Sequence, residues 1–333
     1  MPILSSIGSG SARSLGRGFI GGMKEVFLST ATFNNGGTAV IGNLINGPDI
    51  NESLSGLSNA ARTVIEPNFT MPVNGVQSWR VSYSGLYRVI VAGARGGSSG
   101  ANNNYFGSPI AGGRGAIVLA NVYLSFKDTL YIIAGHRGGY YNGSQDGGGG
   151  GGSFVSVSRY ANGGSPNFLS STLLVAAGGG GGGASNTNGG IASMDGASGQ
   201  SGGGLTPGTG GYGGQNGSGS EHGAGGGGWF GPGTGASQTR GKAVRSNDLA
   251  GATGVYGLSQ NVGGFGGGAA GWGAGGGGGG YSGGGPKTHA STRSGGGGGG
   301  SFVSSGANNI SYLTGNNGNW GDLGNGYVTL TAL

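Results

Sequence analysis

Two identical stretches decide the fold: GGGGGGSFVS at residues 147–156 and again at 295–304. Further glycine runs occupy 178–183, 225–228 and 275–280. A glycine run makes a poor α-helix or central strand, because glycine loses the most backbone entropy on ordering and has no side chain to pack. The ordered alternative is a left-handed threefold helix without internal hydrogen bonds. Its N–H and C=O groups need partners on neighbouring segments, so the runs predict a packed bundle of polyglycine II helices.

The competing interpretation is a disordered glycine linker. Composition favours it, because 93 of 333 residues are glycine and only 8% are charged. Large residues argue against it: Trp229-Phe230, Trp272 and Tyr281 interrupt the runs, and Ser-Phe-Val recurs beside them. Collagen is excluded, because the sequence has no strict Gly-X-Y period and only 9 prolines.

Charge and cysteine content narrow the classes of protein. The net charge is +6 and the sequence pI about 9.6, yet the 16 Lys and Arg residues form no run. A mildly basic solvated surface is therefore favoured over a nucleic-acid site. The chain has no cysteine, which excludes disulfides and thiolate metal sites. Residues 1–8 carry no basic segment followed by an apolar one, so we expect no secretory signal, and no apolar run has the length of a membrane span.

The chain divides into three predicted regions. Residues 1–25 are rich in Gly and Ser and read as an N-terminal docking arm, with Arg13, Arg17 and Phe19 as its contact residues. Residues 26–61 form a small docking region, with a hairpin that turns at Asn-Gly and a short helix that begins near Asp49. Residues 62–333 form the glycine-rich main domain.

The main domain is predicted to be a β-sandwich. Apolar or alternating stretches of strand length occur at 63–65, 69–72, 79–83, 86–91, 116–124, 129–135, 173–177 and 327–331. The glycine tracts then become long insertions between strands of one sandwich. The stretches at 173–177 and 327–331 bracket the glycine region, and we expect them to pair.

Three motifs resemble a known family: FTMP at 69–72, SGLYRVIVAGARGG at 84–97 and TLYIIAGHRGG at 129–139. They are similar to the glycine-rich domain family, which includes the extracellular glycine-rich region of the anaplastic lymphoma kinase and leukocyte tyrosine kinase receptors and many bacterial and phage surface proteins. The resemblance covers roughly residues 65–333. It implies a tumour-necrosis-factor-like, jelly-roll β-sandwich with inserted polyglycine II helices. The receptors' cysteines, membrane span and kinase have no counterpart in this sequence.

In architecture the chain also resembles the host-binding tail-fibre adhesins of T-even-type bacteriophages. In those adhesins, loops that connect polyglycine helices bind the bacterial surface. This likeness is not one of motifs, so no binding residue is carried over. Fibres and tumour-necrosis-factor-like sandwiches suggest a homotrimer, by analogy only.

No catalytic or cofactor motif stands out. A phosphate-binding P-loop requires Gly-Lys-Ser/Thr, but Pro286 precedes Lys287 and Ala243 follows Lys242. The three histidines, His136, His222 and His289, are isolated in sequence. We therefore expect no enzyme activity, no cofactor and no metal site.

Candidate binding residues lie in the segments between glycine runs, of which the three longest are 184–221, 229–262 and 281–294. Aromatic side chains supply large contact areas at low entropic cost, and arginines and lysines add polar contacts. An alternative for Trp272 and Tyr281 is that each packs as a lid on the bundle. The aromatic candidates for receptor binding are Tyr212, Trp229, Phe230, Tyr256, Trp272 and Tyr281, and the cationic ones are Arg240, Arg245, Lys287 and Arg293.

The sequence thus predicts a phage virion tail protein, a tail-fibre or tip adhesin made in the host cytoplasm. We expect contacts with other tail proteins through the N-terminal region and with a host cell-surface receptor, protein or glycan, but neither nucleic-acid binding nor membrane insertion. Two alternatives remain open: a purely structural tail or virion component, and a cellular surface glycine-rich module.

Overall fold

The computed structural model of the chain describes residues 30–34, 69–73, 75–99, 110–139, 146–160, 165–184, 206–215, 223–235, 239–246, 249–252, 261–271, 273–286, 295–313 and 324–333. These residues are mainly β, with one short 3-10 turn, η3 (Phe168–Ser170). The strands are β1 (Thr30–Asn34), β2 (Phe69–Val73), β3 (Val76–Arg80), β4 (Gly85–Ala92), β5 (Ile117–Leu124), β6 (Thr129–Ile133), β7 (Ser153–Ser158), β8 (Thr172–Ala177), β9 (Phe302–Val303), β10 (Asn308–Leu313) and β11 (Tyr327–Ala332).

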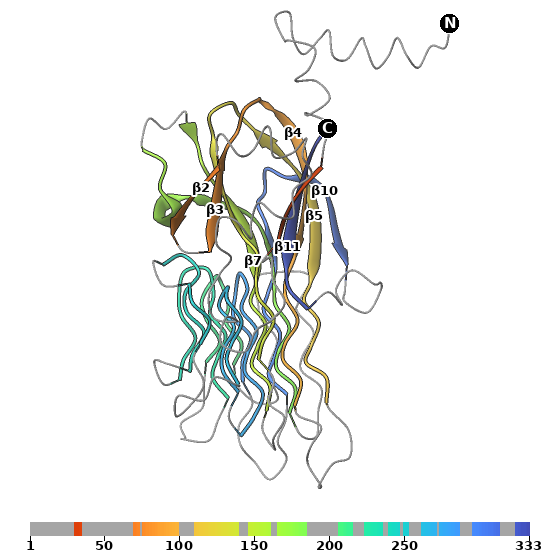
Figure 1. The fold of residues 1–333 in the computed structure, drawn as a ribbon, viewed down its shortest axis with the longest axis vertical. Coiled ribbons are helices and arrows are strands. Elements are labelled where there is room, and N and C mark those ends of the chain that lie inside the picture. The colour runs from red at the N-terminus through yellow and green to blue at the C-terminus, as the bar shows by residue number, and fades with distance from the viewer. Residues whose placement is uncertain are drawn as a thin grey trace, which may run out of the picture.

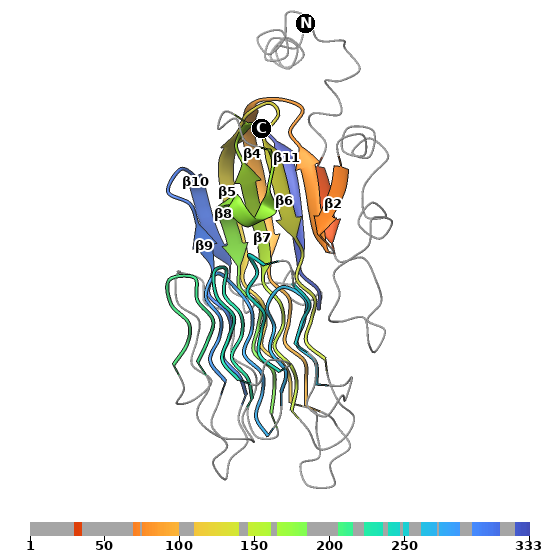
Figure 2. The same ribbon diagram turned by 90° about the vertical axis from the view of Figure 1, so that its left-hand side faces the viewer.

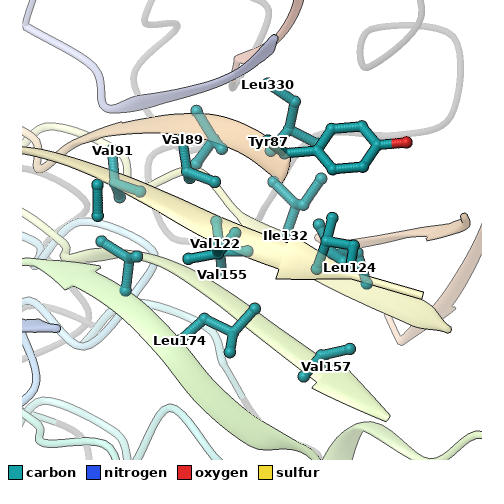
Figure 3. Close-up of a cluster of buried hydrophobic side chains, with 14 of the residues drawn as sticks. Tyr87, Val89, Val91, Val122, Leu124, Ile132, Val155, Val157, Leu174 and Leu330 are labelled. Carbon is teal, nitrogen blue, oxygen red and sulfur yellow. The ribbon is translucent and has the colours of Figure 1, made fainter. Parts of the chain in front are cut away.

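The strands form two antiparallel sheets (Figures 1 and 2). One sheet has the strand order β1-β11-β4-β5-β10, and the other β2-β3-β6-β7-β8-β9. Inward-facing side chains of both sheets join in one buried cluster. Figure 3 shows this layer, where Val89 and Val122 from the first sheet face Val155 and Leu174 from the second. The arrangement is consistent with the predicted β-sandwich.

Six strands continue directly into glycine-rich segments that run on past the same end of the sandwich (Figure 1). Together with the segments between β8 and β9 they form a body that we call the glycine bundle. Its described residues are 93–99, 110–116, 134–139, 146–152, 178–184, 206–215, 223–235, 239–246, 249–252, 261–271, 273–286 and 295–300.

The hydrogen bonds of segment 147–152 repeat every third residue. The N–H groups of Gly147 and Gly150 donate to segment 180–183, those of 148 and 151 to segment 136–139, and those of 149 and 152 to segment 266–269. A β-strand, by contrast, alternates with a period of two and bonds only to neighbours within its sheet. The described positive-φ glycines include none in the runs 147–152, 178–183, 225–228, 275–280 and 295–300.

Segments of the bundle approach so closely that most of its glycines leave no room for a side chain. A Cβ on Gly93 would lie 2.0 Å from the carbonyl oxygen of Gly178, and one on Gly149 would lie 2.0 Å from that of Gly277. Gly93 extends β4 and Gly178 extends β8, which belong to different sheets. The two sheets therefore converge, and their backbones contact each other where the side chains end.

A second buried cluster joins the bundle to the outer face of the β2–β9 sheet. Phe154 and Phe168 on the sheet side meet Trp229 and Phe265 on the bundle side. The buried members are Val76, Tyr131, Ile133, Phe154, Phe168, Leu173, Ala176, Trp229, Val244, Leu249 and Phe265.

Most of the predicted strands are confirmed: β2, β4, β5, β6, β8 and β11 occupy the expected stretches. The stretch 79–83 is shifted, because Val81 exchanges hydrogen bonds with the β5–β6 turn instead of a strand, and β3 ends at Arg80. The prediction that 173–177 pairs with 327–331 is wrong. The chain returns beside β8 as β9 before it crosses to the other sheet, so β8 pairs with β9 and β11 with β4.

Three strands were not predicted: β7, β9 and β10. Of the expected hairpin in 26–41, the structure describes only β1, which pairs with β11, and the predicted turn and second strand lie outside the described residues. The arm at 1–25, the helix near Asp49 and the stretch 63–65 lie outside the described residues.

Candidate functional site

Three of the predicted binding residues come together on the surface of the glycine bundle, near its junction with the sandwich. The rings of Tyr212 and Phe230 lie with centroids 6.4 Å apart and planes tilted by 47°. The guanidinium carbon of Arg245 lies 5.8 Å from the Phe230 centroid. Tyr212 is 62% exposed and Phe230 47%. We call these three residues the junction cluster.

Glycines shape the surface on which the two rings lie. A Cβ on Gly211 would be 2.5 Å from the Phe230 ring, and one on Gly231 would be 2.7 Å from the Tyr212 ring. Gly211 also has a φ of 90°, which other residues rarely adopt. The N–H of Phe230 donates to the Gly211 carbonyl at 2.8 Å. Each ring thus rests on a bare backbone, and the two turns that carry the rings are bonded together.

Hydrogen bonds hold both the backbone and the side chain of Arg245. Its N–H donates to the Trp229 carbonyl at 2.9 Å, and its Nε donates to the Leu169 carbonyl. The side chain is half-buried. A fixed guanidinium beside two exposed rings can contact a planar or anionic group without a large loss of side-chain entropy.

Trp229 corrects the sequence prediction. It is 1% exposed, with its ring centroid 5.6 Å from that of Phe154 and 6.0 Å from that of Phe168. Trp229 is thus a core residue that packs the bundle against the sheet, and its ring is not accessible to a receptor.

The remaining candidates divide into two groups. Tyr281 is half-buried and stacks on Phe302, with centroids 4.6 Å apart, which matches the alternative in which it packs as a lid. Arg240 is half-buried beside Gly241, whose N–H donates to Gly225 within the bundle. The others lie outside the described residues: Tyr256, Trp272, Lys287 and Arg293, and Arg13, Arg17 and Phe19 of the arm.

The described residues carry a one-sided charge. They include ten Lys and Arg and only two acidic residues, Asp128 and Asp146, both 1% exposed. Burial lowers the pKa of His136 to about 4, although its hydrogen bond to the Arg137 carbonyl opposes this shift. The accessible charge on this part of the chain is therefore cationic at neutral pH.

Groups that could support catalysis or metal binding do not gather in the described part of the chain. No set of three His, Asp or Glu side chains there is placed to hold a metal ion. Nor does any helix among the same residues have the length and hydropathy needed to cross a membrane.

Sequence reasoning missed one surface feature. Tyr123, Phe126 and Tyr160 are each more than half exposed and lie at the sandwich end away from the bundle. Phe126 stands in the β5–β6 turn, and a large apolar residue between two predicted strands was the available signal.

No family model matches the chain, and no curated protein matches it either.

Proposed function

We propose that the glycine segments are polyglycine II helices and that the two sheets form a tumour-necrosis-factor-like jelly roll. The three-residue period of the hydrogen bonds supports the threefold helix, because residues i and i+3 of such a helix face the same neighbour. The five runs contain no positive φ, which agrees with the negative φ of this helix. The backbone contacts at the glycine Cα atoms support close lateral packing.

On this scaffold we propose that the chain acts as a phage tail-fibre or tip adhesin that binds the host surface. The observation that carries the proposal is the junction cluster: Tyr212 and Phe230, exposed and immobilised on glycine backbone, with Arg245 beside them. Exposed, rigid aromatic residues next to an arginine are the composition that binding hot spots favour.

The arrangement of the molecule, with the bundle at one end and Leu333 at the other, also supports an adhesin. The last residue, Leu333, lies at the sandwich end opposite the bundle (Figure 1), and Thr30 of β1 pairs there with Thr331. Attachment through that end would leave the sides and far end of the bundle accessible. A cationic surface also speeds encounter with bacterial envelopes, which carry phosphate and carboxylate groups.

The test compares binding of the purified full-length chain to a panel of intact bacterial strains. The variant Tyr212→Ser/Phe230→Ser/Arg245→Gln removes the junction cluster. The control Ile310→Ser/Leu313→Ser removes two side chains, 45% and 41% exposed, from β10. Thermal unfolding first establishes that both variants fold.

We expect the wild type and the control to bind at least one strain and the cluster variant to bind about tenfold more weakly or worse. Equal binding by all three would remove the junction cluster from the proposal. If the wild type binds no strain but virions that carry the cluster variant fail to assemble, the chain is a structural tail component instead.

A further inference from the structure

A second aromatic surface lies at the opposite end of the sandwich from the bundle. Tyr123 on β5 is 56% exposed, and Phe126 in the β5–β6 turn and Tyr160 just after β7 are each 54% exposed. Arg80 at the end of β3 and Lys127 in the turn complete what we call the sandwich-end patch. None of its members belongs to the junction cluster.

Both cations of the patch lie over aromatic faces. The Lys127 ammonium is 5.3 Å from the Phe126 centroid and 5.0 Å from that of Tyr160. The guanidinium carbon of Arg80 is 6.0 Å from the Tyr160 centroid. Such contacts hold the cations in place without neutralising them.

A buried carboxylate keeps the patch rigid. Asp128 accepts hydrogen bonds from the N–H groups of Ser125 at 2.9 Å and Tyr160 at 3.0 Å, so it ties the turn to the segment after β7. It also forms a 2.7 Å ion pair with Arg159. The N–H of Phe126 donates to Ser84 Oγ at 2.7 Å, and Lys127 has a φ of 68°. The backbone segments that carry Phe126 and Tyr160 are therefore fixed relative to each other.

The charge of the patch indicates the chemistry of its partner. Its one carboxylate among the described residues, Asp128, is 1% exposed and already paired with Arg159. Arg80 and Lys127 consequently favour an anionic occupant that also has apolar groups for the rings. Nucleic acid fits less well, because two cations are too few to follow a phosphate backbone. The segment 1–29 fits poorly as well, since it carries Arg13, Arg17 and Lys24 against a single acid, Glu25.

We propose that the sandwich-end patch docks an acidic, apolar-containing segment of a partner protein. The rings supply contact area at low entropic cost, and the two cations select carboxylates and set the orientation. The patch lies at the end where Leu333 also lies, so a partner bound there leaves the junction cluster accessible. This inference holds whether or not the chain is an adhesin.

The experiment is a selection of random dodecapeptides displayed on an unrelated carrier, with the purified full-length chain as bait. Enriched peptides are synthesised, and their affinities are measured by calorimetry against three proteins: the wild type, Lys127→Glu/Tyr160→Ser in the patch, and Ile310→Ser on β10 as the matched surface control. Thermal unfolding confirms that both variants fold.

We expect the enriched peptides to combine at least two Asp or Glu residues with a large apolar residue. They should bind the patch variant about tenfold more weakly, bind the control like the wild type, and weaken as salt rises from about 50 to 500 mM. Enrichment of basic or uncharged peptides, no enrichment at all, or equal binding to the patch variant would overturn the proposal. Binding of heparin or single-stranded DNA at the patch, with no acidic peptide selected, would also overturn it.

Discussion

The sandwich has an interior of packed side chains and the glycine bundle has one of packed backbone, although the same strands run through both. In the sandwich, valine, isoleucine and leucine side chains fill the space between sheets, which typically lie about 10 Å apart. In the bundle, the extensions of those strands lose their side chains, and backbone contacts backbone: the N–H of Ala116, which extends β5, donates to the Gly178 carbonyl, which extends β8, at 2.9 Å. One half depends on side-chain volume and the other on its absence.

The stability of the two halves is sensitive to opposite changes in side-chain volume. Removal of a methyl group weakens a side-chain core through lost contacts and a cavity. In the bundle, addition of a methyl group is the damaging change, because the neighbouring atoms are backbone and cannot rotate away. The bundle accepts methyl groups only where it leaves room, as at the fully buried Ala94, Ala269 and Ala274.

The largest effect is expected for Gly149→Ala in the middle of the bundle. The new Cβ would lie 2.0 Å from the Gly277 carbonyl oxygen, so two hydrogen-bonded segments must separate. We expect a loss of more than about 4 kcal/mol in the free energy of unfolding, beyond ordinary overpacking. Chemical denaturation measures it.

The matched control is Gly306→Ala outside the bundle, where a new Cβ meets no atom within 4 Å and the expected change is under about 0.5 kcal/mol. A similar small effect for Gly149→Ala would mean that the bundle is loosely packed. The contrast between the two halves would then fail.

The next effect tests the attachment of the halves to each other. Trp229→Ala empties the space between Phe154 and Phe168 and should cost about 3 to 4 kcal/mol of unfolding free energy. Phe230→Ala, one residue on and 47% exposed, is the control and should cost under about 1 kcal/mol. Thermal unfolding of both variants measures the difference, and equal effects would contradict the assignment of Trp229 to the core.

These two neighbours also show where sequence reasoning ends. Alternating apolar residues identify β4, because its sheet buries one face. A continuous apolar run identifies β6, which is buried on both faces. Glycine runs likewise identify the bundle, since few ordered structures accept them. Trp229 and Phe230 lie in a turn without any period, so nothing local tells which ring is buried. Tyr212 meets Phe230 only through long-range packing.

The missed strand β10 has a different cause. It is a largely exposed strand at the edge of its sheet among the described residues, with the sequence NNISYL and a bulge after Asn308. Pairing with β5 determines it rather than its own sequence pattern. The sandwich-end patch was missed for a related reason, because Tyr160 follows β7 and is joined to the turn after β5 only by the hydrogen bonds of Asp128.

The free energy of unfolding should depend on pH through His136, which lies where β6 enters the bundle. His136 is 5% exposed, and burial lowers its pKa from 6.5 to about 4. As the pH falls from 6.5 toward 4, His136 binds a proton in the unfolded chain but stays neutral in the folded chain, so the free energy of unfolding decreases. The unfolding free energy keeps its full value above about pH 6.5, and the loss caused by His136 approaches about 3 kcal/mol near pH 4.

Denaturation of the wild type and of His136→Gln between pH 4 and 7.5 checks this expectation. The difference in unfolding free energy between the two proteins should shift in favour of the variant as the pH falls. A difference that stays constant with pH would show that the imidazole is solvated and that the bundle entrance is open to water.

The smallest effect concerns the serine that ends each glycine run in the repeated GGGGGGSFVS motif, where one interior gives way to the other. Ser153 Oγ donates to the Ala92 carbonyl at 2.6 Å and accepts from the Gly135 N–H at 2.9 Å, so it bridges chain segments that leave different sheets. Ser301 Oγ accepts from the Gly178 N–H at 3.1 Å. Ser153→Ala leaves two buried backbone groups without this partner and should cost about 2 kcal/mol, and the change at the fully buried Ser301 should cost at least about 1 kcal/mol.

The exposed Ser305→Ala serves as the reference for this pair and should change the unfolding free energy by under about 0.5 kcal/mol. Because the two motif serines stand at identical places in the repeat, a difference between them can arise only from what surrounds them. Ser153 lies where the two sheets converge, and its hydroxyl links the Ala92 carbonyl to the Gly135 N–H. If Ser301→Ala proved the more damaging, the transition from side-chain core to backbone core would be centred on β9 and not on β7.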